Sequence, residues 1–118
     1  MIAVYIAGPL TTGDMMANIR LAVREAARVQ AAGMAPYVPH LSAFTDMIAL
    51  ESTGYEEWMA LDFEMLSRCD CLLRIGLESP GAAREVMFAI EHGIPVFYGV
   101  DWMLAAAADG RIKERKPQ

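Results

Sequence analysis

The stretch CDCLLRIGLESPGAAREVMFAIEHGIPVFY, residues 69–98, carries the clearest fold signal in the chain. It begins with a short apolar run, residues 69–75, which is typical of a strand buried on both faces. Residues 80–92 then show helical spacing, and Gly93 is placed to end that helix. A second apolar run follows at residues 94–98. A strand, a helix and a strand in this order predict two parallel strands joined by a crossover helix.

The same alternation continues on both sides of this stretch. Residues 41–54 have neither a strand nor a helix pattern, so we expect a loop there with at most a helical turn. The remaining expected elements are strands at residues 2–7 and 34–38 and helices at residues 14–32, 55–68 and 101–108. This order predicts an α/β fold: a three-layer, flavodoxin-like or Rossmann-like parallel sheet with helices on both faces.

Length and composition indicate one packed domain. The chain has 118 residues, of which 55% are hydrophobic and 21% are charged, and this excludes an intrinsically disordered protein. We expect the domain to span residues 1–110 and residues 111–118 to form a basic, solvated C-terminal tail. The cations of that tail are Arg111, Lys113, Arg115 and Lys116.

Charge and hydropathy restrict the partners and the location. A net charge of −5 argues against a nucleic-acid polymer or an anionic membrane as partner, because clustered Lys and Arg are needed to hold phosphates. No apolar run is long enough to span a bilayer, and the first residues do not have the pattern of a secretory leader, so we expect a cytoplasmic protein. Cys69 and Cys71, which would point the same way on one strand, are expected to be reduced core thiols.

The start of the helix at residues 80–92 is the strongest candidate site. Ser79 is a good N-cap, and the free amides of Gly81 and Ala82 would face the space above the sheet, where helix starts bind anions. On a helical wheel Glu85 borders the buried stripe of this helix. It could therefore point into a cleft as a nucleophile or base, or it could be a surface glutamate paired with Arg84.

A second carboxylate is placed unusually for its type. Trp58, Leu61, Met65 and Leu66 define the apolar face of the helix at residues 55–68, and Asp62 lies among them. Aspartate is a poor residue in the middle of a helix and is rarely buried without a partner. Asp62 therefore indicates either a structural hydrogen bond to a loop or a ligand. Trp58 itself is interpreted as a packing group.

Ligands of parallel sheets bind beyond the carboxyl ends of the strands, and two further segments end strands here. The first turn offers small residues, hydroxyls and free amides, but it lacks the lysine and the glycine spacing of a phosphate-binding P-loop. Its candidate binding residues are Gly8, Pro9, Thr11, Thr12 and Gly13. His40 follows the second strand and has either a pocket role or a structural one. No group of residues has metal-ligand spacing, so neither a metal nor a cofactor is expected.

These segments together resemble one known family. The motifs are Tyr-Ile-Ala-Gly-Pro at 5–9, Trp-Met-Ala-Leu-Asp at 58–62, Cys-Asp-Cys-Leu-Leu-Arg at 69–74, Ser-Pro-Gly-Ala-Ala-Arg-Glu at 79–85 and Gly-Ile-Pro-Val-Phe-Tyr at 93–98. In this order and spacing they resemble the nucleoside 2-deoxyribosyltransferase-like superfamily, most closely its small bacterial and phage branch, related to nucleotide N-glycosidases. The resemblance covers nearly the whole chain.

The resemblance implies an activity and roles for several residues. It implies cleavage of the N-glycosidic bond of a small nucleoside or nucleoside 5′-monophosphate, by an N-glycosidase or deoxyribosyltransferase. Glu85 matches the catalytic nucleophile, Tyr5 the aromatic residue that orients it or the sugar, and Asp62 the aspartate near the base or sugar. Gly8 matches the backbone at the ligand, and Ser79 the serine that touches the 5′-phosphate in nucleotide N-glycosidases. A homo-oligomer, dimer or tetramer, is also implied.

One departure from the family leaves alternatives open. Residues 99–103 lack the asparagine that transferases lend to a neighbouring subunit, which puts base specificity and true transfer in question. The alternative is a non-catalytic nucleotide-binding or sensing protein with the same pocket. A phosphoribohydrolase of the cytokinin-activating type fits less well, because its Pro-Gly-Gly-rich loop is missing.

Overall fold

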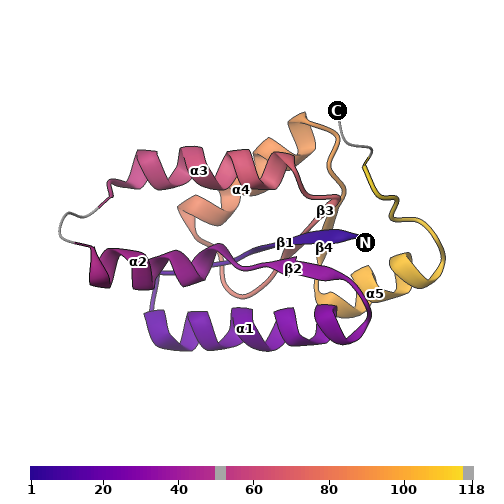
Figure 1. The fold of residues 1–118 in the computed structure, drawn as a ribbon, viewed down its shortest axis with the longest axis horizontal. Helices are drawn as coiled ribbons and strands as arrows, with labels where there is room; N and C mark the ends of the chain where they lie inside the picture. Colours follow the sequence, from indigo (N-terminus) through magenta and orange to yellow (C-terminus); the bar gives the residue numbers. More distant parts are fainter. Residues whose placement is uncertain (50–52, 116–118) are drawn as a thin grey trace.

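The protein, in a computed structural model that describes residues 1–49 and 53–115, is built on a four-stranded parallel sheet (Figure 1). The strands lie in the order β2-β1-β3-β4, so β1 and β3 are central. The elements in chain order are β1 (Ala3–Ala7), α1 (Met15–Ala31), β2 (Ala35–Tyr37), the 3-10 helix η1 (Pro39–Leu41), α2 (Ser42–Ile48), α3 (Tyr55–Ser67), β3 (Cys71–Arg74), α4 (Pro80–Glu91), β4 (Val96–Tyr98) and α5 (Val100–Ala108).

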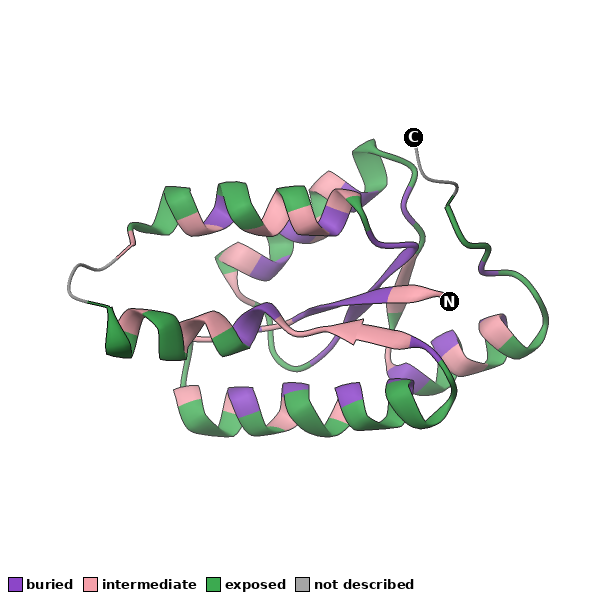
Figure 2. Cartoon of the chain, viewed as in Figure 1, coloured by how far each residue is buried: buried purple, intermediate pink, exposed green. Residues whose placement is uncertain are grey.

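Helices cover both faces of the sheet. Helices α1 and α5 pack on one face and α3 and α4 on the other, with the buried residues on the strands and on the inward sides of the helices (Figures 1 and 2). This three-layer α/β architecture confirms the fold expected from the sequence.

The central strand β1 divides its side chains between the two layers. Because alternate residues of a strand point to opposite faces, Val4 and Ile6 join the core under α1 and α5, and Tyr5 and Ala7 join the core under α3 and α4. All four are fully buried. Tyr5 is thereby aimed toward the layer that contains α4.

The predicted helix starts are confirmed at atomic detail. The side chain of Asp14 accepts a hydrogen bond from the Ala17 amide at 3.1 Å, and Ser79 Oγ accepts one from the Ala82 amide at 3.2 Å. Each cap satisfies one of the amides that a helix start leaves free. Pro80 occupies the first turn of α4, where its missing N–H costs no helix bond.

The segment expected to be a loop contains more structure than its sequence pattern suggested. Residues 42–48 form α2, directly after η1, while residues 50–52 of that expected loop lie outside the described residues. Helix α2 has seven residues, and none of them is buried; its apolar residues Phe44, Met47 and Ile48 are exposed. So short a helix gives only a weak periodic pattern, which explains why the sequence indicated at most a helical turn.

Two details of the expected core are wrong. On α3, Leu61 is exposed and Met59 is buried instead, so the packed face is rotated relative to the prediction. Strand β3 begins at Cys71, and Cys69 lies in the preceding turn, so the two thiols do not point the same way. Cys69 packs under α3 and α4 and Cys71 under α1 and α5; both are buried and free.

The sequence predicts a C-terminal tail that is free in solvent, but the described part of this tail packs against the domain. Ile112 is buried in the core under α1 and α5. The guanidinium of Arg115 donates to the Ser67 carbonyl at 2.7 Å, and its amide donates to the carboxylate of Asp70. Lys116 lies outside the described residues. Among residues 1–49 and 53–115, no helix is long and apolar enough to cross a membrane.

Asp70 ties both ends of the chain to the sheet, and we expect its loss to destabilise the fold. Its buried carboxylate also accepts from the Ala3 amide at 2.7 Å. Asp70→Ala leaves two amides without a partner and should lower the free energy of unfolding by about 2–3 kcal/mol, measured by urea denaturation. Asp101→Ala, which removes an exposed ion pair with Arg28, is the control and should cost under about 1 kcal/mol. Equal losses in the two variants would contradict this role for Asp70.

Candidate active site

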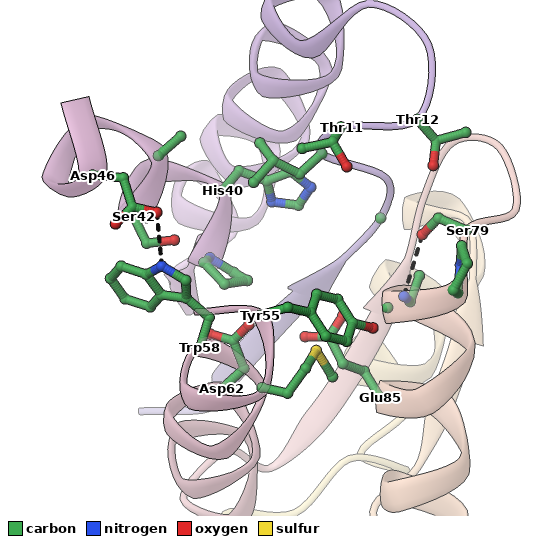
Figure 3. A pocket seen from close by; sticks show the side chains of 18 of the residues that line it. Thr11, Thr12, His40, Ser42, Asp46, Tyr55, Trp58, Asp62, Ser79 and Glu85 are labelled. Carbon is green, nitrogen blue, oxygen red and sulfur yellow. Dashed lines mark hydrogen bonds between the residues drawn. The ribbon is translucent and has the colours of Figure 1, made fainter. Parts of the chain in front are cut away.

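A cavity of about 420 Å³ opens beyond the carboxyl ends of the strands. Its walls come from the turn after β1, from η1 and α2, and from the facing sides of α3 and α4 (Figure 3). Nine of the residues predicted from the sequence line it: Gly8, Thr11, Thr12, His40, Asp62, Ser79, Gly81, Ala82 and Glu85. Segments far apart in the chain are therefore brought together at one site.

Three predicted residues do not line the cavity. Tyr5 lies behind its wall, fully buried, and reaches the site only through Glu85. Pro9 is buried and lies against Gly76, where its Cδ would be 3.1 Å from a Cβ on that glycine. Gly13 is exposed, with a φ of +80° that suits glycine in the turn leading into α1.

Other lining residues were not predicted as ligand contacts. Trp58, interpreted as a packing group, forms part of the wall, and Asp46 from α2 faces it. The remaining unpredicted lining residues are Leu10, Pro39, Ser42, Ala43, Thr53, Tyr55, Met59 and Pro80. Asp46 carries no signal in the sequence, because it lies in residues 41–54, which show neither a strand nor a helix pattern. Its role depends on a contact with α3.

Glu85 is a buried carboxyl group in the cavity wall. Only 5% of the residue is exposed, and the Tyr5 hydroxyl donates a hydrogen bond to its Oε2. The pKa of Glu85 is raised to about 8, chiefly by burial; the nearby Asp62 carboxylate also raises it, and the hydrogen bond from Tyr5 and the charge of Arg74 lower it. The alternative partner, Arg84, points elsewhere and makes a two-point ion pair with Glu56 at 2.9 and 3.2 Å.

Asp62 faces the same cavity from α3 (Figure 3). It is partly buried, and desolvation raises its pKa to about 6. Two carboxyl groups with raised pKa values in one cleft are a common feature of acid–base sites. With these pKa values the pair holds one proton near neutral pH, mainly on Glu85.

His40 is a buried ring without a partner. It is 3% exposed, and among the described residues neither ring nitrogen has a hydrogen-bond partner. Burial lowers the pKa of His40, an effect partly offset by the nearby backbone of Gly8 and Pro9. An unpaired polar group inside a protein costs free energy, and both ring nitrogens of His40 are themselves buried.

Gly8 keeps this end of the cavity open. A Cβ at position 8 would lie 2.8 Å from Ile75 Cγ1 and 2.9 Å from the Ile75 carbonyl oxygen, and 3.5 Å from His40 Nε2. The Ile75 backbone cannot move aside to relieve such a contact, as the end of a flexible side chain could. Only glycine therefore lets the end of β1 pass this close to the end of β3.

The polar lining is acidic and neutral rather than basic. Within the described residues, neither Lys nor Arg lines the cavity. The positive end of the site is the start of α4, whose macrodipole points toward the cavity; the Ala82 amide, expected to be free, already donates to Ser79 Oγ. In the same described part of the chain, no group of three potential metal ligands is placed to hold an ion.

Comparison with known proteins identifies the family. A model of the family described as a domain of unknown function, DUF7768, matches residues 2–99. The chain belongs to this family. Among curated proteins, none matches the sequence significantly.

Solved structures show which fold this DUF7768 protein shares. A 2-deoxyribosyltransferase from Bacillus psychrosaccharolyticus matches with a TM-score of 0.56 and 20% identity over 80% of this chain and 69% of its own. A conserved protein from Enterococcus faecalis V583 matches with a TM-score of 0.63 and 22% identity, over 92% of this chain and 76% of its own. A 2-deoxyribosyltransferase from Leishmania mexicana matches with a TM-score of 0.60 and 22% identity, over 82% of this chain and 63% of its own. Less than two thirds of that enzyme is therefore covered. The deoxyribosyltransferase-like fold expected from the motifs is thus confirmed.

Burial of Glu85 should make the stability of this protein pH-dependent. The carboxyl has an ordinary pKa of 4.5 in the unfolded chain and about 8 in the folded one, so the folded state holds an extra proton between these values. The free energy of unfolding should therefore fall as pH rises from about 4.5 to about 8, by a few kcal/mol relative to Glu85→Gln. Thermal or urea denaturation across this range measures the difference. The exposed Glu91→Gln is the control, and an identical pH dependence in Glu85→Gln and wild type would contradict the prediction.

Proposed function

We propose that this protein cleaves the N-glycosidic bond of a small nucleoside or nucleoside 5′-monophosphate, with Glu85 as nucleophile. The observation that carries the proposal is the buried Glu85 carboxyl, held by the Tyr5 hydroxyl and facing the same cavity as Asp62. A carboxylate of this kind stabilises the positive charge that develops at a sugar C1′. The 2-deoxyribosyltransferase names of two structural neighbours add to this support, although they establish the fold alone.

The reaction balances with these two carboxyl groups. The Glu85 carboxylate forms a bond to C1′ while the C1′–N bond breaks, and the electron pair of that bond goes to the base nitrogen. Asp62 gives its proton to the departing base. In the second step water, or a second base, attacks C1′ and its proton passes to Asp62. Glu85 leaves as a carboxylate, and both groups return to their starting states.

Tyr5 and the substrate set the distribution of protons. The reactive form has an ionised Glu85 and a protonated Asp62, whereas the free site gives Glu85 the higher pKa. The hydrogen bond from Tyr5 favours the ionised Glu85. A bound base would cover Asp62 and remove water from it, and this raises its pKa further. Substrate binding therefore shifts the shared proton toward Asp62.

The opposite side of the cavity suits the sugar or its 5′-phosphate. Thr11 and Thr12 offer hydroxyls, Ser79 and the start of α4 offer a hydroxyl and amides, and His40 offers an unpaired ring. These are donors for an anionic or hydroxyl-rich group. His40 gains a proton readily when an anion arrives, because the anion offsets the effect of burial on its pKa.

The proposal is tested by measuring free base released from deoxynucleosides and deoxynucleoside 5′-monophosphates by liquid chromatography. Glu85→Gln keeps the size of the side chain but removes the nucleophile, so turnover should fall by roughly a thousandfold or more while the variant stays folded. Glu91→Gln on the same helix should match wild type. Undiminished turnover in Glu85→Gln would overturn the mechanism. Saturable nucleotide binding with no product in wild type would support the non-catalytic sensing role instead.

The shared proton predicts a bell-shaped pH profile. The reaction needs one proton on the carboxyl pair. We therefore expect kcat/KM to rise with an apparent pKa of about 6, to reach a maximum near neutral pH and to fall with an apparent pKa of about 8. Asp62→Asn should lower the rate and abolish the alkaline limb, since only the ionisation of Glu85 then matters. An alkaline limb that persists in Asp62→Asn would exclude Asp62 as the acid.

A further inference from the structure

The end of the cavity away from Ser79 carries a carboxylate that the mechanism does not use. We infer that Asp46 is a specificity-determining residue that accepts hydrogen bonds from an amino-bearing edge of the leaving base. The inference rests on the proposed function, and it names the substrate class: bases with an exocyclic amino group.

Two donors hold the Asp46 carboxylate in a fixed orientation (Figure 3). The indole Nε1 of Trp58 donates to Oδ2 at 2.8 Å, and the amide of Thr53 donates to Oδ1 at 3.0 Å. A carboxylate has about four acceptor positions, so each oxygen retains capacity for one more donor. Because Asp46 lines the cavity, that capacity is available to a ligand there.

Asp46 is placed to contact the base if the bond between the base and the sugar lies beside Asp62. Trp58 and Asp62 are four residues apart on α3 and so share one face of the helix. Thr12, Ser79 and Glu85 lie on the other side of the cavity from Asp46 (Figure 3). A base that extends from Asp62, away from the sugar side, therefore meets the flat indole and then the carboxylate. An aromatic wall is suited to a planar ring.

The chemistry of a carboxylate restricts what can lie there. It accepts hydrogen bonds but donates none, so an amino group on the base edge is matched, whereas a carbonyl puts lone pairs against its negative charge. A site with a buried or fixed acceptor also discriminates strongly against an analogue that lacks the donor. Guanine and hypoxanthine differ only in the exocyclic amine, and cytosine carries an amine where uracil carries a carbonyl.

A structural role for Asp46 must be separated from this one. The contacts with Trp58 and Thr53 connect α2 to the start of α3, so Asp46→Asn could lower stability whatever the ligand does. A purely structural effect lowers activity on all substrates alike. The ratio of kcat/KM between paired substrates is therefore the measurement that isolates recognition.

The test uses the 5′-monophosphates of deoxyguanosine, deoxyinosine, deoxycytidine and deoxyuridine with the full chain. Wild type should prefer the amino-bearing member of at least one pair by about 10- to 100-fold in kcat/KM, as expected for a hydrogen bond to a charged group. Asp46→Asn should bring that ratio close to one. Trp58→Phe, which keeps an aromatic wall but frees the carboxylate, should reduce it partially. The exposed Asp101→Asn should leave it unchanged.

Binding measured by titration calorimetry on the same four nucleotides separates this inference from the proposed function. Turnover without a preference for the amine, or with a preference that both Asp46→Asn and Trp58→Phe retain, overturns the role of Asp46 and leaves the glycosidase intact. Amine-selective binding that Asp46→Asn abolishes, with no base released, supports Asp46 and overturns the glycosidase. No saturable binding of any of the four nucleotides overturns both.

Discussion

The hydrogen bond from the Tyr5 hydroxyl to Glu85 is the interaction on which the site depends. A carboxyl group with 5% exposure is costly to ionise, and the hydrogen bond from Tyr5 reduces that cost by lowering the pKa of Glu85, which burial raises. The donor is available because Tyr5 lies on the central strand, where neighbouring strands on both sides hold it rigidly in register. Burial in turn raises the pKa of Tyr5, so its hydroxyl stays protonated and remains a donor. The sheet thus supplies a fixed donor for the helix carboxyl that we propose as the nucleophile.

The sheet also determines how the cavity is opened. Strand β1 ends at a glycine that packs directly on the backbone of Ile75, so the chain can turn away into α1 without filling the space above the sheet. Helix α4 starts at that same edge, after the short segment that follows β3, and presents the positive end of its dipole there. Parallel strands put these ends side by side, which explains why residues from the first turn, η1, α3 and α4 converge.

The sequence predicted those features that depend on short-range patterns. Residues 69–98 show a strand, a helix and a strand in their apolar spacing, and Asp14 and Ser79 are recognisable caps. The wheel position of Glu85, at the border of the buried stripe, allowed either an inward carboxyl or a surface glutamate paired with Arg84, and the structure has the buried one. Features that arise from contacts between distant segments were not accessible in this way. Helix α2 has only seven residues and buries none of them, and Ile112 in the tail is buried only because the folded core offers it a place. Tyr5 as the partner of Glu85 came from family resemblance, not from spacing.

The balance of charge in the cavity favours chemistry that develops positive charge. Glu85, Asp62 and Asp46 place three carboxyl groups around it, and within the described residues no Lys or Arg offsets them there. Such a lining repels an anionic transition state but stabilises an oxocarbenium-like sugar, whose charge is absent from the neutral ground state. A phosphate, if present, belongs at the start of α4, where the helix dipole opposes the acidic groups. Separation of the two charges along the cavity lets one site hold an anion at one end and stabilise a cation in the middle.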